Sequence, residues 1–118
     1  MVPSTISFDI DGTLAEGPFD KGRVEDMAVR GNVLRTLRLL HRAGYQIRVV
    51  TARPDIYKEA TIRWLRRNAV PYHELRMRED GDNRPDPELR AEQAEGSVVL
   101  FDDRPDNCDR FAGRCVRV

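Results

Sequence analysis

Short β-rich hydrophobic segments alternate with segments of helical periodicity along the whole chain, and this alternation limits the possible folds more than any other feature. Strands joined by helices of about 10 to 15 residues are typical of a parallel sheet covered by helices on both faces. The pattern predicts an α/β fold with a doubly wound, Rossmann-like parallel sheet of about five strands. Strands are predicted at residues 5–8, 45–51, 72–77, 97–101 and 115–118, and helices at residues 32–42, 56–68, 88–95 and 106–112.

The charges of the chain balance, with 20 Lys and Arg against 20 Asp and Glu among 118 residues. A protein that coats nucleic acid non-specifically normally carries a strong basic excess, so this class is excluded. The length suits one domain, and 40% hydrophobic residues are enough for a buried core. Since there is neither an apolar run of about 18 residues nor a basic and apolar leader, we expect a cytoplasmic protein with no membrane partner.

Two residue types leave alternatives open. Only Lys21 and Lys58 of the 20 basic residues are lysine. The excess of arginine reflects either a GC-rich genome or arginines that bind phosphate with their planar guanidinium groups. Cys108 and Cys115 match no metal-ligand spacing, and we expect them to be reduced thiols.

Acidic residues follow two of the predicted strands: Asp9 and Asp11 follow the first, and Asp102 and Asp103 follow the strand at 97–101. The carboxyl ends of parallel strands meet at one edge of a sheet, so these four carboxylates would converge and repel one another unless a cation neutralised them. Oxygen ligands favour Mg²⁺ over Zn²⁺. The sequence therefore predicts a Mg²⁺ site; the alternative is that the acids cap helices or lie in solvated turns.

The same residues resemble the motifs of the haloacid dehalogenase (HAD) superfamily of aspartate-based phosphotransferases. Residues 9–13 (DIDGT) resemble motif one, Thr51 after two valines resembles motif two, and the pair at 102–103 resembles motif four. The resemblance covers nearly the whole chain. It implies that Thr51 hydrogen-bonds the phosphoryl oxygens and that Thr13 contacts the substrate.

The resemblance also implies a covalent mechanism. Asp9 would attack the phosphoryl group to form an aspartyl phosphate, and Asp11 would protonate the leaving oxygen and then activate the hydrolytic water. The metal ligands would be the Asp9 side chain, the Asp11 backbone carbonyl and Asp102, with Asp103 beside the ion directly or through water. Motif three is a lysine or arginine that balances the charge of the nucleophile.

Arg90 is the best candidate for motif three, and Arg84 is the alternative. Lys58 follows Thr51 too closely to fill this role, and no lysine lies later in the chain before motif four. Each arginine could instead be a solvated charge on a helix or loop.

A narrower resemblance rests on the segments GYQIRVVTAR, VPYHELRMREDGDNRPDPELRAE and VVLFDDR. They resemble the 3′-phosphatase domain of bacteriophage-type polynucleotide kinase-phosphatases. By this resemblance Arg53 would bind the substrate phosphate, Asp86 would orient Arg90 across one helical turn, and Arg84 would shape the loop before that helix with Arg78 and Asp82. The sequence departs from the family in placing arginine at motif three and in a shorter loop after motif one.

These observations predict a Mg²⁺-dependent phosphomonoesterase that removes 3′-phosphate from DNA or RNA ends. We expect residues 1–118 to form a single HAD-like phosphatase domain without a cap domain, because no segment is long enough to hold one, and an open site suits a strand end. No P-loop is present. The domain is therefore either separate or one module of a larger end-healing enzyme, with a polynucleotide kinase domain as its partner. The alternatives are a HAD-type phosphatase of nucleotides or small phosphorylated metabolites, and a non-catalytic phosphate-binding module.

Overall fold

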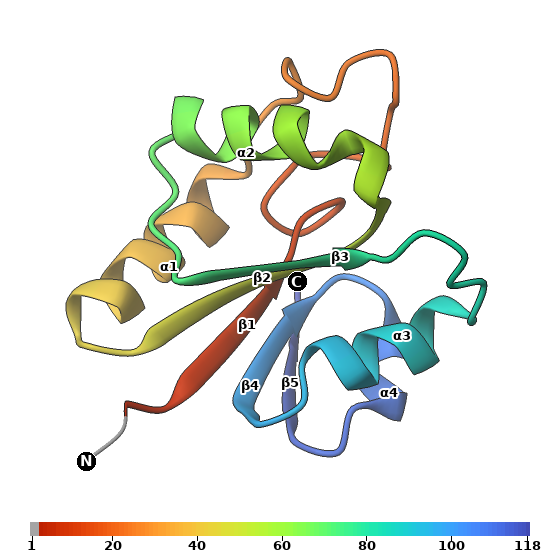
Figure 1. The fold of residues 1–118 in the computed structure, drawn as a ribbon. Coiled ribbons are helices and arrows are strands. Elements are labelled where there is room, and N and C mark those ends of the chain that lie inside the picture. Colours follow the sequence, from red (N-terminus) through yellow and green to blue (C-terminus); the bar gives the residue numbers. More distant parts are fainter. Residues whose placement is uncertain (1–2) are drawn as a thin grey trace.

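One five-stranded parallel sheet organises the protein in the computed structural model, which describes residues 3–118 (Figure 1). The strand order is β3-β2-β1-β4-β5, and every neighbouring pair is parallel. The connection from β3 to β4 crosses to the other side of β1, so the order reverses between β1 and β4. The strands are β1 (Thr5–Asp9), β2 (Gln46–Pro54), β3 (Glu74–Arg78), β4 (Ser97–Asp102) and β5 (Arg114–Arg117).

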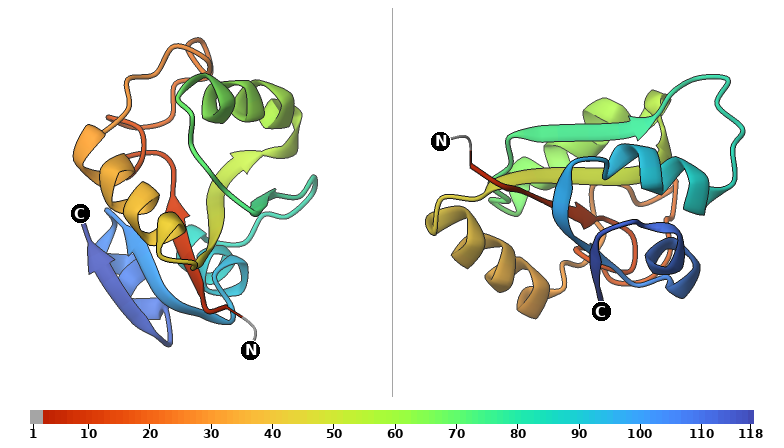
Figure 2. Two further views of the ribbon diagram at one scale, coloured as in Figure 1. Left: turned by 90° about the vertical axis from the view of Figure 1, so that its left-hand side faces the viewer. Right: turned by 90° about the horizontal axis from the view of Figure 1, so that it is seen from below.

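Helices cover both faces of the sheet, as Figures 1 and 2 show. On one face, α1 (Gly31–Arg42) and α2 (Lys58–Arg67) bury a core that includes Phe8, Leu37 and Trp64. On the other face, α3 (Asp86–Gln93) and α4 (Pro105–Arg110) cover a smaller core that includes Leu100 and Phe111. A 3₁₀ turn, η1 (Asp55–Tyr57), precedes α2. The predicted doubly wound α/β fold without a cap is confirmed for the described residues.

Most element boundaries differ from the prediction by one or two residues, and two of the differences near the carboxyl edge of the sheet affect the site. β2 continues to Pro54 instead of ending at residue 51, and α3 begins at Asp86 instead of residue 88. The proline after Asp86 is favourable in the first turn of a helix, because the N–H that it lacks has no partner there. Among the described residues, no helix is both long and apolar enough to cross a bilayer.

The expectation of reduced cysteines is wrong in this structure, where Cys108 and Cys115 form a disulfide. The chain reverses between α4 and β5, which brings the two Cα atoms to 5.4 Å, within the usual range for a disulfide. This proximity depends on how α4 packs beside β5, and the spacing of seven residues did not reveal it.

Candidate active site

Asp9 is the last residue of β1, and a tight turn directly follows it. The turn is closed by backbone hydrogen bonds from the Ala15 N–H to the Ile10 carbonyl at 2.8 Å and from the Gly12 N–H to the Ala15 carbonyl at 2.9 Å. Gly12 has a φ of +85°, and a Cβ there would lie 2.2 Å from Oδ2 of Asp103. Glycine is therefore required here both by the backbone conformation and by the close approach of the Asp103 side chain.

Asp9, Asp102 and Asp103 form a carboxylate cluster, in which one oxygen of each lies within 4.8 Å of the others. The pairing of β1 with β4 explains this, because Phe8 lies opposite Phe101 and both strands end at the same edge. Asp9 and Asp102 are buried. The sequence predicted that four carboxylates converge. Three of them do, whereas the Asp11 side chain pairs with Arg53 instead.

Arg90 of α3 reaches into this cluster and is almost fully buried. One guanidinium nitrogen lies 2.9 Å from Oδ1 of Asp9, and another pairs with Oδ2 of Asp102. Its Nε donates to the Gln93 side chain at 3.2 Å, and Gln93 in turn donates to the Thr51 carbonyl at 2.8 Å. Arg90 therefore lies where a residue that balances the charge of Asp9 must lie.

Arg84, the alternative for that position, is directed away from the cluster. It bonds Asp82 at 2.7 Å and Glu92 at 2.5 Å on the outer side of the loop. The hydrogen bond from Arg84 lowers the pKa of Asp82 to about 2. Arg84 lines a separate hollow and not the cavity that contains Asp9.

The electrostatics of the cluster leave negative charge uncompensated. Burial raises the pKa of Asp9 well above its ordinary value against the lowering effect of Arg90, and Asp102 and Asp103 raise it further. Burial also raises the pKa of Asp102. Burial would lower the pKa of Arg90, but the Asp9 and Asp102 charges outweigh it and raise that pKa. One arginine therefore faces three carboxylates.

A divalent cation fits this arrangement. The donors are all oxygen, as Mg²⁺ prefers, and a cation would remove the repulsion among them. Asn107 donates to both carboxylate oxygens of Asp102, at 3.1 and 3.3 Å. The buried Oδ1 of Asn107 has no hydrogen-bond partner among the described residues, which is unusual for a buried polar atom and is consistent with a ligand beside it.

Asp11 forms a bidentate ion pair with Arg53, whose side chain is fully buried. Nη2 of Arg53 lies 2.7 Å from Oδ1 of Asp11, and Nε of Arg53 lies 3.0 Å from Oδ2 of Asp11. Arg53 also donates to the Thr61 hydroxyl at 3.1 Å, and its guanidinium lies 4.8 Å from the centre of the Phe19 ring. These contacts hold the Asp11 carboxylate in one orientation, apart from the carboxylate cluster of Asp9, Asp102 and Asp103.

The two predicted threonines are both fully buried beside these groups. The Thr13 hydroxyl donates to Oδ2 of Asp9 at 3.1 Å and lies 3.4 Å from Oδ1 of Asp103. The Thr51 hydroxyl accepts the Arg53 backbone N–H at 3.1 Å. Thr13 thus links the two acidic segments, and Thr51 fixes the backbone where β2 reaches the site.

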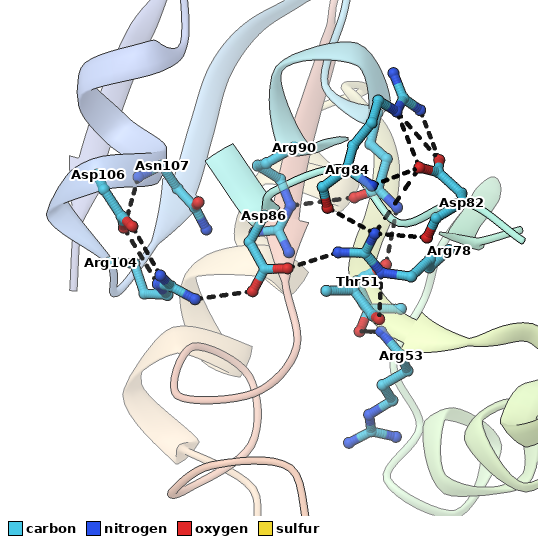
Figure 3. A network of polar contacts seen from close by, with 12 residues as sticks. Thr51, Arg53, Arg78, Asp82, Arg84, Asp86, Arg90, Arg104, Asp106 and Asn107 are labelled. Carbon is cyan, nitrogen blue, oxygen red and sulfur yellow. Dashed lines mark hydrogen bonds and ion pairs between the residues drawn. The ribbon is translucent and has the colours of Figure 1, made fainter. Parts of the chain in front are cut away.

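Asp86 does not pair with Arg90, contrary to the expectation that it would orient that arginine. Figure 3 shows it between Arg78, at 2.6 Å, and Arg104, at 2.8 Å. Asp86 is at the start of α3, where its side chain points across the loop and not along the helix toward Arg90. Arg78 also donates to the backbone carbonyls of Asp82 and Arg84, each at 2.9 Å, and so holds the loop.

Several of these side chains line a cavity of about 360 Å³ at the carboxyl edge of the sheet, whereas Thr13, Thr51 and Asp102 are fully buried and do not line it. Sequence reasoning missed five of its residues: Pro18, Phe19, Ala52, Arg104 and Asn107. Arg104 could have been suspected because it directly follows the motif-four acids. Phe19 and Asn107 lie in a loop and a short helix that carry no recognisable pattern. The cavity is lined by Asp9, Asp11, Pro18, Phe19, Ala52, Arg53, Asp86, Arg90, Asp103, Arg104 and Asn107.

Comparisons with solved structures find proteins of the same fold. The chain superposes on one chain of a Pnkp1/Rnl/Hen1 complex and on one of a Pnkp1/Rnl/Hen1 RNA repair complex, with TM-scores of 0.89 and 0.88 and 25% identity in each case. These matches cover 99% and 98% of this chain but 46% and 42% of the other chains, so this chain spans less than half their length. A protein from Mesorhizobium loti described as a HAD-like phosphatase superposes with a TM-score of 0.57 at 15% identity, covering 92% of this chain and 66% of that one, which supports the fold alone.

A family comparison covers nearly the whole chain. The family described as the polynucleotide kinase PNKP phosphatase domain matches residues 3–110. This range includes β1 through α4 and therefore every side chain of the cavity. The resemblance seen in the sequence motifs is confirmed, and the chain belongs to the polynucleotide kinase PNKP phosphatase domain family of HAD-type phosphatases.

Proposed function

We propose that this domain removes the 3′-phosphate from DNA or RNA ends in a Mg²⁺-dependent reaction that forms an aspartyl phosphate on Asp9. The observation that carries the proposal is the juxtaposition, in one uncapped cavity, of the buried Asp9 beside Arg90 with the separately oriented Asp11–Arg53 pair. Asp9 is thus placed beside Arg90, which balances its charge, as the nucleophile. Asp11 is held apart by Arg53 as the general acid and base.

In the first step, a carboxylate oxygen of Asp9 forms a bond to phosphorus while the bond from phosphorus to the 3′ oxygen breaks. Asp11 gives its proton to the departing 3′ oxygen. In the second step, Asp11 takes a proton from a water molecule, whose oxygen attacks the phosphorus and releases Asp9 and inorganic phosphate. Arg53 orients Asp11 for both proton transfers.

The Asp9 and Asp102 side chains and the Asp11 backbone carbonyl would hold Mg²⁺, with Asp103 beside it. When bound, the ion supplies the positive charge that lets an anionic nucleophile approach an anionic phosphate. Arg90 remains between Asp9 and Asp102 and neutralises part of their charge. Thr51 is assigned to the phosphoryl oxygens, and Thr13 keeps Asp9 in place near the substrate.

The polynucleotide substrate is supported by the family and by the shape of the site. No cap covers the cavity among residues 3–118, so a long strand can reach it. Arg53 and Arg104 line the cavity and provide planar cations for phosphate oxygens, and Asp86 sets the position of Arg104. One structural relative is part of an RNA repair complex. Because those relatives are more than twice as long, we also propose that a polynucleotide kinase domain cooperates with this domain.

The test is phosphate release from an oligonucleotide that carries a 3′-phosphate, with Mg²⁺ or with a chelator. The same oligonucleotide with a 5′-phosphate, a mononucleotide 3′-phosphate and a sugar phosphate are the comparison substrates. We expect Mg²⁺-dependent release that is fastest for the 3′-phosphorylated oligonucleotide and absent in Asp9→Asn. Preference for the sugar phosphate would contradict the substrate, and undiminished release by Asp9→Asn would contradict the mechanism.

A further inference from the structure

We infer that the outer face of α1 binds the phosphate backbone of a polynucleotide. This face carries Arg35, Arg38 and Arg42, all exposed, and is called the arginine face below. The inference rests on the proposed function only in taking the bound strand to be the substrate. It concerns a surface outside the catalytic cavity, which contains none of the three arginines.

The arginine face has no carboxylate partner. The sequence of α1, GNVLRTLRLLHR, contains no Asp or Glu. Within residues 3–118, no carboxylate oxygen lies within 4.0 Å of these three arginines, although nine other arginines of the chain form such pairs. The chain has 20 acidic residues, but none of them is in α1.

The stability of the helix does not explain this distribution. Like charges three or four residues apart destabilise a helix by about 0.2–0.5 kcal/mol per pair, and the spacing of the three arginines produces two such pairs. The negative end of the helix dipole favours Arg42 in the last turn but not Arg35, which lies nearer the positive end. A positive surface that is unfavourable for the isolated helix is expected where an anion binds.

The surroundings of the arginine face fit a strand better than a single ion. A hollow of about 570 Å³ runs along it, and its lining contains no acidic residue. Arg38 and Arg42 also border a second hollow of about 480 Å³. Leu39, 55% exposed, offers an apolar contact for sugars or bases. The first hollow is lined by Val29, Gly31, Leu34, Arg35, Arg38, Leu39, Arg42 and Asn68.

The spacing of the arginines also suits a polynucleotide. With a rise of about 1.5 Å per residue, Arg35 and Arg42 are about 10 Å apart along the helix. Phosphates of a stacked strand follow one another at about 3.4 Å along the axis, so about three of them span this length. Arg38 donates to the carbonyls of Asn68 and Ala69 at 2.9 and 3.4 Å, which positions the middle guanidinium.

The arginine face begins next to the catalytic turn. Arg30, directly before α1, donates its backbone N–H to the Leu14 carbonyl at 2.7 Å and its side chain to the Gly12 carbonyl at 2.8 Å. Gly31, the first residue of α1, lines the hollow. A polynucleotide strand whose end is in the cavity can therefore continue along α1. The chain has zero net charge, but its charges are unevenly distributed and leave a positive surface on this helix.

The test measures binding without turnover. A fluorescent single-stranded oligonucleotide ending in a 3′-hydroxyl is titrated with wild type and with the double variant Arg35→Gln/Arg42→Gln at several salt concentrations. Each lost phosphate contact lowers the slope of log affinity against log salt by about 0.7, so the variant should have a slope smaller by about 1.4. Between about 50 and 200 mM salt, wild type should then lose about 7-fold more affinity than the variant.

Arg114→Gln/Arg117→Gln is the matched control, because these arginines lie on β5, are also exposed and have no carboxylate partner among the residues that the structure describes. An equal slope for wild type and Arg35→Gln/Arg42→Gln would overturn the inference, and so would an equal loss in the control pair. Tighter binding of a polyglutamate peptide than of the oligonucleotide would assign the surface to an acidic protein instead. Since the probe carries no phosphate to remove, failure of the proposed phosphatase activity would not produce any of these results.

Discussion

Replacing Gly12 by alanine should separate catalytic geometry from stability. The φ of +85° is in the left-handed region, which costs an L-residue about 1–2 kcal/mol. Gly96 has nearly the same φ, +83°, with open space around the position of its Cβ. Gly12→Ala and Gly96→Ala should therefore lose similar stability, about 1–2 kcal/mol. For a chain of this size the melting temperature should fall by roughly 4 °C per kcal/mol.

Only Gly12→Ala should also disturb the carboxylate cluster. The new Cβ would lie 2.2 Å from Oδ2 and 2.5 Å from Cγ of Asp103. These atoms are at the end of a side chain, so Asp103 can rotate away at little cost in folding energy, but it then leaves Asp9 and Asp102. Loss of a group that supports a metal site typically reduces metal affinity or activity about 10–100-fold.

The assay combines urea denaturation with phosphate release at increasing Mg²⁺ concentration for both variants. We expect equal losses of stability, with a 10–100-fold loss of activity or of apparent Mg²⁺ affinity in Gly12→Ala alone. Wild-type activity in Gly12→Ala, or an equal loss of activity in Gly96→Ala, would refute the reasoning.

Three further predictions concern the charges of the site. Because burial raises the pKa of Asp9 and of Asp102, the metal-free protein should lose stability as pH rises from about 4, the ordinary pKa of an aspartate, through the higher folded values. Asp9→Asn should reduce this loss and raise the melting temperature at neutral pH without metal, as calorimetry would show; an unchanged pH dependence would contradict the burial of an ionisable Asp9. Arg90→Ala should lower the free energy of unfolding of the metal-free protein, measured by urea denaturation, by about 3–5 kcal/mol, because the buried carboxylates lose their cation. Arg84→Ala should lower it much less, because Arg84 pairs outside the cluster. Equal effects would contradict the assignment of Arg90 to the cluster. Arg53→Lys cannot reproduce the bidentate bond to Asp11, so kcat should fall at least 10-fold, while Arg63→Lys, in an exposed pair, should keep wild-type kcat.

The parts of the site that follow from sheet topology could be predicted from the sequence. Asp9 and Asp102 end hydrophobic strands, and any parallel sheet that pairs those strands brings the two residues together. Arg90 could be named as the better of two candidates, because the one lysine between the second and fourth motifs, Lys58, follows Thr51 too closely. Such inferences need only strand ends and the order of motifs along the chain.

The parts that depend on loop packing could not be predicted. Asp86 bonds Arg78 and Arg104 because the loop before α3 folds against the start of α4, and no periodicity encodes this contact. The Cys108–Cys115 disulfide likewise depends on the turn between α4 and β5. Short-range patterns specify helices and strands, whereas these contacts arise only when the elements are packed together.

The central claim, that Asp9 accepts the phosphoryl group from a polynucleotide 3′ end, is tested most directly by following that group. An oligonucleotide with a radioactive 3′-phosphate is mixed with the enzyme and Mg²⁺, the reaction is quenched within one turnover, and the labelled peptide is identified by mass spectrometry. The account predicts label on Asp9 in the wild type and an unlabelled Asp9→Asn protein. Release of radioactive phosphate with no label on Asp9 at any quench time would contradict it.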